Sequence, residues 1–542
     1  MPSPFLWLSI LGPLSLAMLG LIPNAVAARR TRAVVTAARY AATGALTIAV
    51  GTGVAVAALG AIRTPALSVQ GIGFSLYLDA LSATMFVLVA FIGLIVIAYS
   101  GNYLDGDPQQ GRFLSRLCVT LACVLGLIIS GNLFQLALLW IATSLGLNGL
   151  LKFYPDRPAA VLAARKKFLV SRLGDLCLVA AMVLLYRAFG SLDYATLFAA
   201  CEALRQPTPA GIHAAAALMV IAAALKSAQF PMHGWLIEVM ETPTPVSALL
   251  HAGIINAGGF LLLRFADLLV LSAPSLDGLA LIGGFTALFG SAVMLPQSSI
   301  KVSLAYSTVA QMGFMMLECG LGAFPAALLH IVAHSFYKAH AFLSSGSVID
   351  IARNAWSPPP GSNPHPARLV LVIALVVGMT LGVSVMAGAS PAEKPGLFAL
   401  AAVMMFSLIH LIASGIDEQP SVYVVMRTAA RAVVVAVVFF GLQLGFERLL
   451  ISAGPAAMPH HGPIELAIAC LVIVSFSALT VFQSLLPYRQ DKASWQSLYA
   501  HIYNGLYVNT LANRWIIRLW PSPPPPRTHA LHANVHMRGV QA

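Results

Sequence analysis

The chain has 542 residues, of which 59% are hydrophobic and only 9% are charged, with 31 Lys and Arg against 19 Asp and Glu. Soluble globular domains carry about 25% charged residues, so the composition excludes a soluble protein, and the dominance of apolar residues excludes disorder. Long unbroken apolar runs also differ from the alternating pattern of a transmembrane β-barrel. The composition therefore predicts a polytopic α-helical membrane protein.

Fifteen apolar segments are long enough to cross a bilayer, whose hydrocarbon core requires about 20 residues of helix. No basic stretch precedes the first segment, which indicates a retained helix rather than a cleaved signal peptide. We therefore expect an all-α fold of about 15 transmembrane helices. The predicted spans lie near 4–22, 40–62, 77–99, 113–130, 134–151, 168–187, 213–230, 245–263, 276–296, 301–319, 325–350, 367–387, 396–415, 428–446 and 465–487.

The net charge of +12 is spread over short connections between the apolar segments, which fits membrane orientation and argues against nucleic-acid binding. With the N-terminus outside, the cytoplasmic connections carry Arg29, Arg30, Arg32, Arg39, Arg112, Lys152, Arg157, Arg165, Lys166, Lys167, Arg353, Arg368 and Arg427. The opposite side carries only Arg63, Arg187, Arg205, Arg264, Lys394 and Arg448. The sequence thus predicts a multi-pass protein of the bacterial inner membrane, with its N-terminus outside and its C-terminus in the cytoplasm.

Motifs for enzymatic chemistry are lacking in the sequence. The six cysteines are scattered without a CxxC pair, which excludes a zinc ribbon or an iron–sulfur framework. No nucleotide-binding loop or nucleophile–base arrangement is recognisable. We therefore expect no cofactor, no metal site and no enzymatic activity of the chain itself.

Ionisable groups inside spans are costly and mark candidate functional sites. In LKSAQFPMHGWLIEVMETPTPVSALLHA, Lys226 ends an apolar run and Pro231 follows five residues later, which predicts a helix break between them or shortly after. The PTP at 243–245 then begins a helix that carries His251. An alternative remains open for Lys226, because it lies about 6 Å from the predicted helix end and could extend to the cytoplasmic edge.

A second cluster lies in PAALLHIVAHSFYKAHAFL. His330, His334 and Lys338 recur every four residues and therefore share one helix face, rising about 6 Å per step. Histidine titrates near neutral pH and a buried lysine can lose its proton, so this stripe is typical of a proton relay. A metal site lacks a Cys or carboxylate ligand nearby, and hydrogen-bonded core histidines explain one His better than three aligned groups.

Few other charges lie within or next to the spans. Asp79 lies at the start of the third span, and Arg172 and Asp175 are spaced to pair within the sixth. Glu238 and Glu241 follow the predicted break, and Glu238 or Asp175 are the carboxylates that could approach Lys226. Lys301 opens the tenth span, where an interfacial anchor is the simplest interpretation.

Two segments resemble a known family. KSAQFPMHGWLIEVMETPTPVSALLHAGIINAGG and IKVSLAYSTVAQMG resemble the antiporter-like subunits of respiratory complex I (NADH-quinone oxidoreductase subunit L/5) and of Mrp-type cation/proton antiporters, over roughly residues 70–350. The resemblance implies two inverted five-helix repeats, each with a broken helix. It implies that Lys226 is the central lysine of the first half-channel with His251 as its neighbour. It also implies that His330, His334 and Lys338 are the relay on the eleventh helix.

Departures from this family point to a particular branch. Complex I members carry a Glu on the fifth helix that pairs with the central lysine, and here Ile141 stands at that place. The twelfth-helix lysine of the second repeat also has no counterpart in 367–387. The ending LYAHIYNGLYVNTLANRWIIRLWP resembles the membrane subunits of the DAB inorganic carbon pump. That resemblance implies a subunit that conducts H+ or Na+ and powers a DabA-like cytoplasmic zinc protein, which hydrates CO2.

The expected organisation has five parts, and three functions stay open. Residues 1–112 form the first three helices, 113–263 and 276–415 the two antiporter-like repeats, 428–487 the C-terminal helices, and 488–542 an interfacial helix and a disordered tail. The first function is the ion-conducting subunit of an inorganic carbon pump. The second is a subunit of a complex I-type oxidoreductase or an Mrp-type antiporter. The third is a non-conducting scaffold for the DabA-like partner.

Overall fold

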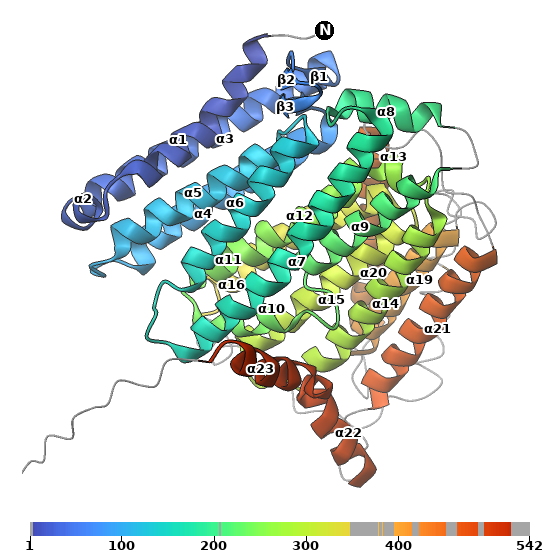
Figure 1. The fold of residues 1–542 in the computed structure, drawn as a ribbon. Helices are drawn as coiled ribbons and strands as arrows, with labels where there is room; N and C mark the ends of the chain where they lie inside the picture. The colour runs from blue at the N-terminus through green and yellow to red at the C-terminus, as the bar shows by residue number, and fades with distance from the viewer. Residues whose placement is uncertain are drawn as a thin grey trace, which may run out of the picture.

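The helices pack side by side and run between two common ends of an elongated bundle (Figure 1). The computed structural model describes residues 4–204, 208–346, 395–414, 422–450, 463–485 and 493–521, with the single positions 378 and 382. One end holds the N-terminus, the β-strands and α8, and is called the strand end here. The opposite end holds α2, α10 and α23, and is called the tail end (Figure 1).

The N-terminal third supplies the first helices of the bundle. They are α1 (Leu11–Met18), extended by the 3₁₀ turns η1 (Pro4–Ile10) and η2 (Leu19–Leu21), α2 (Asn24–Arg29), α3 (Thr31–Leu59), α4 (Ala80–Tyr103), α5 (Gln110–Ile128), α6 (Leu133–Leu151), α7 (Pro158–Phe189) and α8 (Tyr194–Ala203). Two of them begin well before the predicted spans. The span at 40–62 is part of α3 from Thr31, and the span at 168–187 is part of α7 from Pro158, whose ring suits the first turn of a helix.

The middle of the chain forms shorter and interrupted helices. They are α9 (Ala210–Lys226), α10 (Gly234–Glu238), η3 (Val239–Glu241), α11 (Thr244–Ala252), η4 (Ile254–Asn256), α12 (Ala257–Arg264), α13 (Ala266–Leu269), α14 (Ala273–Met294), α15 (Ile300–Gly320) and α16 (Phe324–Leu343). The C-terminal part contributes α19 (Pro395–Ser414), α20 (Val422–Leu450), α21 (Pro463–Leu485), α22 (Ala493–Tyr503), η6 (Gly505–Tyr507) and α23 (Val508–Leu519). The predicted span at 367–387 and the predicted disordered tail lie outside the described residues.

Within the described residues, nine helical segments are long and apolar enough to cross a membrane. They are α3, α4, α5, α6, α7, α11 with α12, α14, and parts of α20 and α21. Shorter apolar helices cover Trp7–Leu21, Ala210–Lys226 and Pro395–Phe406. The predicted span at 301–319 is helical as α15, and the predicted span at 325–350 is helical as α16 up to Leu343. Both helices fall outside the nine, because His, Lys, Glu and other polar residues lower their hydropathy. The chain is therefore a multi-pass helical membrane protein.

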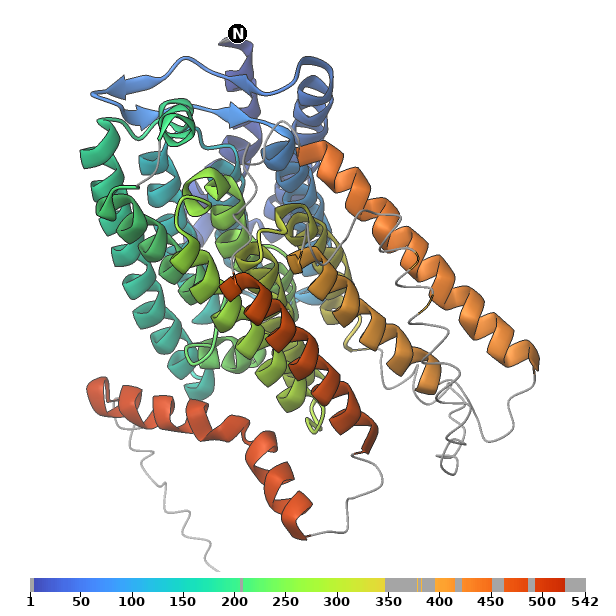
Figure 2. The ribbon, with the colours of Figure 1, turned by 90° about the vertical axis from the view of Figure 1, so that its right-hand side faces the viewer.

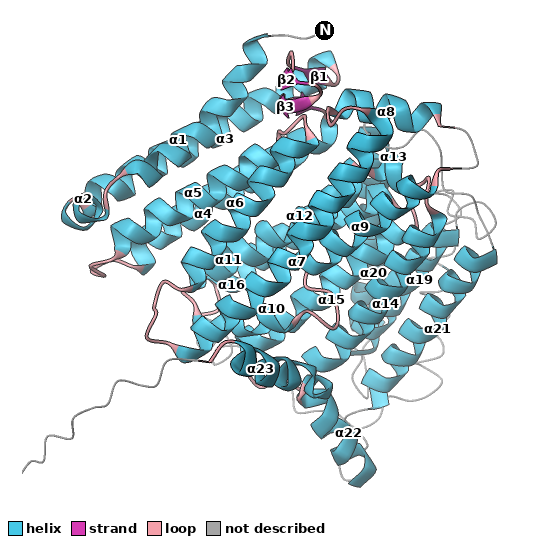
Figure 3. Ribbon diagram, in the orientation of Figure 1, coloured by secondary structure: helices cyan, strands magenta, loops and turns pink. Residues whose placement is uncertain are grey.

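Four short strands at the strand end modify the expected all-α fold (Figure 3). β1 (Ile62–Arg63) pairs antiparallel with β4 (Tyr77–Leu78), and β2 (Leu67–Val69) pairs with β3 (Ile72–Phe74). Gln70 and Gly71 both have positive φ, as a two-residue hairpin turn requires. A Cβ on Gly71 would lie 2.6 Å from the Ser191 Oγ, so this hairpin also lies tight against the end of α7.

Glycines allow the closest helix pair to form. α14 and α15 pack along their length, and a Cβ added at Gly313 would lie 2.5 Å from the Ala287 backbone nitrogen. Gly283 and Gly290 of α14 are equally close to the backbone of α15. In a membrane, where helix association depends on van der Waals packing, such small residues let helix backbones approach closely.

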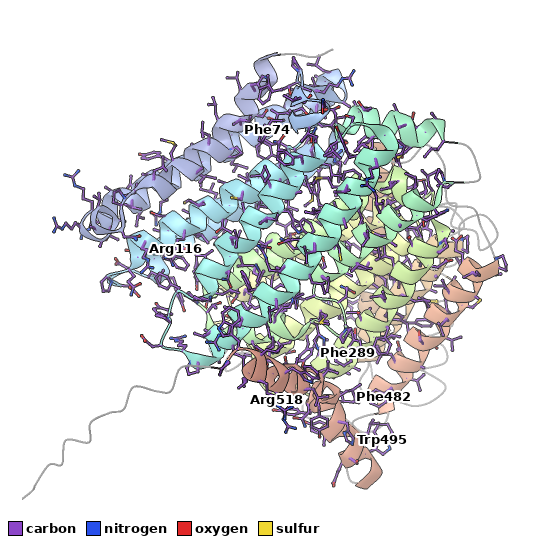
Figure 4. The ribbon with its side chains drawn as sticks, viewed as in Figure 1. Phe74, Arg116, Phe289, Phe482, Trp495 and Arg518 are labelled. Carbon is purple, nitrogen blue, oxygen red and sulfur yellow. The ribbon has the colours of Figure 1, made fainter. Side chains whose placement is uncertain are left out.

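The last two helices cross beneath the bundle at its tail end, as Figure 2 shows. Phe482 at the end of α21 stacks on Trp495 of α22, with ring centroids 5.4 Å apart (Figure 4). α23 then packs against α7 and α10. The sequence expected one interfacial helix after residue 488, and the structure divides it into two at Asn504–Tyr507, where Leu506 and Tyr507 have positive φ.

Candidate functional site

The helix break predicted next to Lys226 is present. α9 ends at Lys226, residues 227–233 are not helical, and α10 begins at Gly234. Two groups of this segment bond to neighbouring helices, as a buried break requires, while Gln229 Oε1 and both ring nitrogens of His233 have no hydrogen-bond partner in the described residues. The Ser227 hydroxyl donates to the Ile255 carbonyl at 2.9 Å, and the Phe230 backbone N–H donates to Thr286 Oγ1 at 3.1 Å. The break is thus stabilised by hydrogen bonds to other elements of the bundle.

Aromatic rings enclose this break on the side of α14 and α15. Phe289 of α14 lies 5.0 Å from both Phe230 and His233, measured between ring centroids (Figure 4). Tyr306 of α15 lies 6.2 Å from His233. Edge and tilted contacts of this kind add directional packing to the apolar burial. They fix the position of the loop that leads from Lys226 to α10.

Lys226 points into the bundle, toward α6. Its ammonium group donates to the Ser144 hydroxyl at 3.0 Å and to the Trp140 carbonyl at 3.4 Å, and lies 4.4 Å from the centroid of the Trp140 ring. The residue is 8% exposed. The alternative in which Lys226 extends to the cytoplasmic edge is therefore wrong. The cation–π contact and two hydrogen bonds partly replace the water that the ammonium group has lost.

Three basic residues that the sequence placed in a connection lie inside α7 instead. Arg165, Lys166 and Lys167 are all buried, because α7 begins at Pro158 and this turn packs against α6, α10 and α23. The Lys167 ammonium donates to the Ser144 carbonyl at 2.6 Å, so it reaches the same residue as Lys226. These groups were not predicted as part of the site, because every Lys and Arg between apolar runs was counted as a loop residue.

Glu238 is not the carboxylate partner of Lys226. Its Oε1 lies 2.6 Å from the Lys166 ammonium and accepts hydrogen bonds from Asn509 at 3.0 Å and Asn513 at 2.7 Å. The C-terminal helix α23 therefore contributes two amides to an ion pair between α7 and α10. Glu241 ends η3 next to it, and its side chain is outside what the structure describes.

The acidic residue of α7 behaves as expected. Arg172 and Asp175 form a local ion pair at 2.6 Å, three residues apart on one helix face. Arg172 is therefore the direct partner of Asp175, and Asp175 is not within ion-pair distance of Lys226 or Lys167.

His251 of α11 lies with the second cluster. Its Nδ1 is 2.9 Å from Thr308 Oγ1 of α15, and its ring stacks on Phe342 of α16 at 4.3 Å. The side chain is fully buried. The resemblance placed His251 beside Lys226, and the structure places its ring against the helices that carry the second cluster.

The α16 stripe faces the protein interior, as predicted. Lys338 is fully buried and donates to the Leu304 carbonyl of α15 at 3.0 Å, and His334 is 5% exposed. His330 completes the stripe, and its Nδ1 lies 3.0 Å from Glu318 Oε2. Glu318 was not among the predicted site residues, although an acidic residue within a predicted span is itself a signal. Lys338, His334 and His330 therefore follow one face of α16, and Glu318 of α15 bonds to the last of them.

A buried ion pair at the strand end was also missed. The Arg264 guanidinium binds Asp79 through two hydrogen bonds of 2.6 and 2.9 Å, with side-chain exposures of 2% and 1%. Asp79 caps α4 as well, since its Oδ1 accepts from the Ser82 backbone N–H at 2.9 Å. Lys301 opens α15, with its ammonium 3.5 Å from Thr244 Oγ1.

The site thus consists of two separate centres of buried polar groups inside the bundle. Its first centre joins Lys167 and Lys226 on Ser144, and its second joins Lys338, His334 and His330 on α16. In the part of the chain that the structure describes, no group of three or more His, Cys, Asp or Glu residues could hold a metal ion. Titratable groups placed in this way inside a bundle are typical of ion and proton pathways.

The fold and these buried lysines define the class of protein, an antiporter-like membrane subunit. Residues 130–356 match the family described as NADH:quinone oxidoreductase/Mrp antiporter, and residues 67–114 match the N-terminus of complex I chain 5. The structure of the Mrp complex from Dietzia sp. DQ12-45-1b is similar, with a TM-score of 0.61 and 25% identity over 95% of this chain and 59% of that chain. The membrane-bound sulfane sulfur reductase, an archaeal respiratory membrane complex, shares the fold, with a TM-score of 0.56 and 17% identity over 94% of this chain and 100% of that chain.

Curated relatives indicate the branch of this family to which the chain belongs. The "probable inorganic carbon transporter subunit DabB2" of Halothiobacillus neapolitanus is 40% identical over 85% of this chain and 83% of its own length. The "probable inorganic carbon transporter subunit DabB" of Hydrogenovibrio crunogenus is 37% identical over 85% of this chain and 86% of its own length. The NAD(P)H-quinone oxidoreductase chain 5 of a Synechocystis species is 40% identical over 50% of this chain and 40% of its own length. The chain therefore belongs to the DabB family, within the antiporter-like membrane subunits of complex I and Mrp complexes.

Proposed function

We propose that the chain is the ion-conducting membrane subunit of an inorganic carbon uptake pump. It carries H+ or Na+ inward and delivers the energy of that flux to a DabA-like cytoplasmic zinc protein. In this proposal, the partner hydrates CO2 to bicarbonate, and the membrane subunit itself performs no covalent chemistry on carbon. Lys226, His251, His330, His334 and Lys338 carry the ion through the bundle.

One observation carries this proposal: lysines are buried at two separate centres inside a membrane bundle. Lys226 is 8% exposed and Lys338 is fully buried, and neither has a carboxylate within ion-pair distance in the described residues. A fixed buried charge without a counter-ion is strongly unfavourable, whereas a group that can give up its proton escapes this cost. Lysines in such surroundings suit a role in which they gain and lose a proton.

The architecture gives further support. The proposal includes about 15 transmembrane helices and two inverted five-helix repeats, each with a broken helix, of which the α9–α10 break is the first. It also includes an N-terminus outside and a cytoplasmic C-terminus in the bacterial inner membrane. The N-terminus and α23 lie at opposite ends of the bundle (Figure 1), as this topology requires. The supporting charges are Asp79, Arg172, Asp175, Glu238, Glu241 and Lys301.

The test is uptake of labelled bicarbonate by cells that lack carbonic anhydrase and express the chain with its cytoplasmic partner. We expect uptake that stops when a protonophore, or for Na+ a sodium ionophore, collapses the ion gradient. Expression of either protein alone is the control and should give no uptake. Uptake that survives the loss of both gradients would reject the conducting role and favour a scaffold.

A further inference from the structure

Two lysines from different helices converge on one serine in the first centre. Lys167 of α7 donates to the Ser144 carbonyl at 2.6 Å, and Lys226 of α9 donates to the Ser144 hydroxyl at 3.0 Å. Both side chains are buried, with exposures of 3% and 8%. Ser144 lies one turn after Ile141 on α6, so the nearest residue one turn earlier offers no charge to Lys226. The amine of Lys167 thus occupies the neighbourhood in which a counter-ion to Lys226 would be expected.

The charges around this pair do not neutralise both lysines. The carboxylate of Asp175 on α7 is bound to Arg172 at 2.6 Å. Lys166 on the neighbouring turn is already paired with Glu238. Within the described residues, neither Lys167 nor Lys226 has a carboxylate within ion-pair distance. Two ammonium groups at this place would repel each other in a medium of low dielectric, so one excess proton for the pair is the favoured state.

A small cavity is lined by both lysines. It has a volume of about 10 Å³, the space of about one water molecule, and is lined by Lys167, Lys226, Ser171 and Trp235 among others. The Trp235 indole N–H, in a residue that is 4% exposed, has no hydrogen-bond partner in the described residues. A water molecule here would satisfy the indole donor and stand between the two amines.

We propose that Lys167 is a second proton-carrying residue that shares one excess proton with Lys226, in place of a lysine–glutamate pair. This deepens the proposed function, on which it rests. In the transfer step, an N–H bond of one ammonium breaks and its proton passes to the water. An O–H bond of the water breaks in turn, and that proton forms the new N–H bond on the other amine. The water is regenerated and the net charge of the pair is unchanged.

The competing explanation is that Lys167 only anchors α7 to α6 through the Ser144 carbonyl. Lys167→Gln separates the two roles, because a glutamine amide can still donate to that carbonyl but cannot take part in proton exchange. Lys167→Arg is the second variant, because it keeps a donor and a positive charge but cannot release its proton. Lys152→Gln is the matched control, since it removes a lysine charge at the C-cap of α6, outside the pair.

The assay is ion flux into proteoliposomes that contain the purified complex with its cytoplasmic partner, followed by a pH-sensitive dye between pH 6 and 9. For Lys167→Gln we expect at least a tenfold loss of flux, and a changed pH profile because Lys226 then titrates alone rather than as one of a coupled pair. Lys167→Arg should also lose flux, and Lys152→Gln should behave as the original protein. Size-exclusion chromatography checks that each variant assembles.

Flux within twofold of the original for Lys167→Gln, or reduced flux with an unchanged pH profile, would overturn the proposal and leave Lys167 as an anchor. If the Gln variant does not assemble, Lys167→Arg decides: full flux overturns the proposal and lost flux supports it. Failure of the proposed function would give a different result from failure of the lysine-pair proposal. The original complex would then conduct ions without supporting bicarbonate uptake, and the flux assay would still test the lysine pair.

Discussion

The buried pair between Asp79 and Arg264 offers a sharp test of how the bundle is held together. We choose Asp79→Asn because the amide oxygen can still cap α4 through the Ser82 N–H, so the contribution of the cap, about 1 kcal/mol, is retained. What is lost is the negative charge against the Arg264 guanidinium, in a pair that is 2% and 1% exposed. Breaking a buried ion pair by removing one charge costs about 3–5 kcal/mol.

This cost lowers the folding equilibrium constant by roughly two to three and a half orders of magnitude. The assay is equilibrium unfolding of the purified protein in mixed detergent micelles with increasing dodecyl sulfate, followed by tryptophan fluorescence. The double variant Asp79→Asn/Arg264→Met should recover to within about 1 kcal/mol, because no uncompensated charge then stays buried. Asp105→Asn, at an exposed position, is the control and should change stability by less than about 0.5 kcal/mol. A loss below about 1 kcal/mol for Asp79→Asn alone would refute the reasoning.

Two further predictions concern packing and the C-terminal helix. Gly313→Ala should lower the yield of folded protein in size-exclusion chromatography, because its Cβ would lie 2.5 Å from the Ala287 backbone nitrogen. The control Gly149→Ala, with nothing within 4 Å of its Cβ, should leave the yield unchanged, and equal yields for the two variants would contradict the packing argument. The double variant Asn509→Ala/Asn513→Ala should release α23 from Glu238 and increase proteolysis near residues 504–507 at least severalfold. Asn504→Ala is the control, because the Asn504 amide bonds only within its own turn. Unchanged proteolysis of the double variant would show that the two amides do not hold the helix.

The sequence predicted the features that depend on local chemistry. A lysine followed by a proline within an apolar run predicted the break after Lys226, since proline cannot continue a helix. The four-residue spacing of His330, His334 and Lys338 predicted one shared face, and burial of that face follows from the cost of a charge in lipid. Both predictions need only a few neighbouring residues, and the structure agrees with both.

Features that depend on distant contacts were not predictable in this way. Asp79 and Arg264 are 185 residues apart, and nothing near either residue points to the other. Lys166 and Lys167 were assigned to a loop because counting of basic residues assumes that charges between apolar runs are exposed. Their burial comes from α10 and α23, which cover this turn of α7. A usable signal was present in the Ala-rich segment from Pro158, which favours a helix that begins ten residues earlier.

The central claim is that Lys226 must gain and lose a proton during transport, and substitution by arginine tests it most directly. In cells without carbonic anhydrase that express the chain with its cytoplasmic partner, Lys226→Arg and Lys226→Ala should both abolish bicarbonate uptake. Arginine cannot release the proton and alanine cannot hold it. Both variants should still co-purify with the partner, because Lys226 is buried inside the bundle. Normal uptake by Lys226→Arg would contradict the claim and make Lys226 a fixed charge.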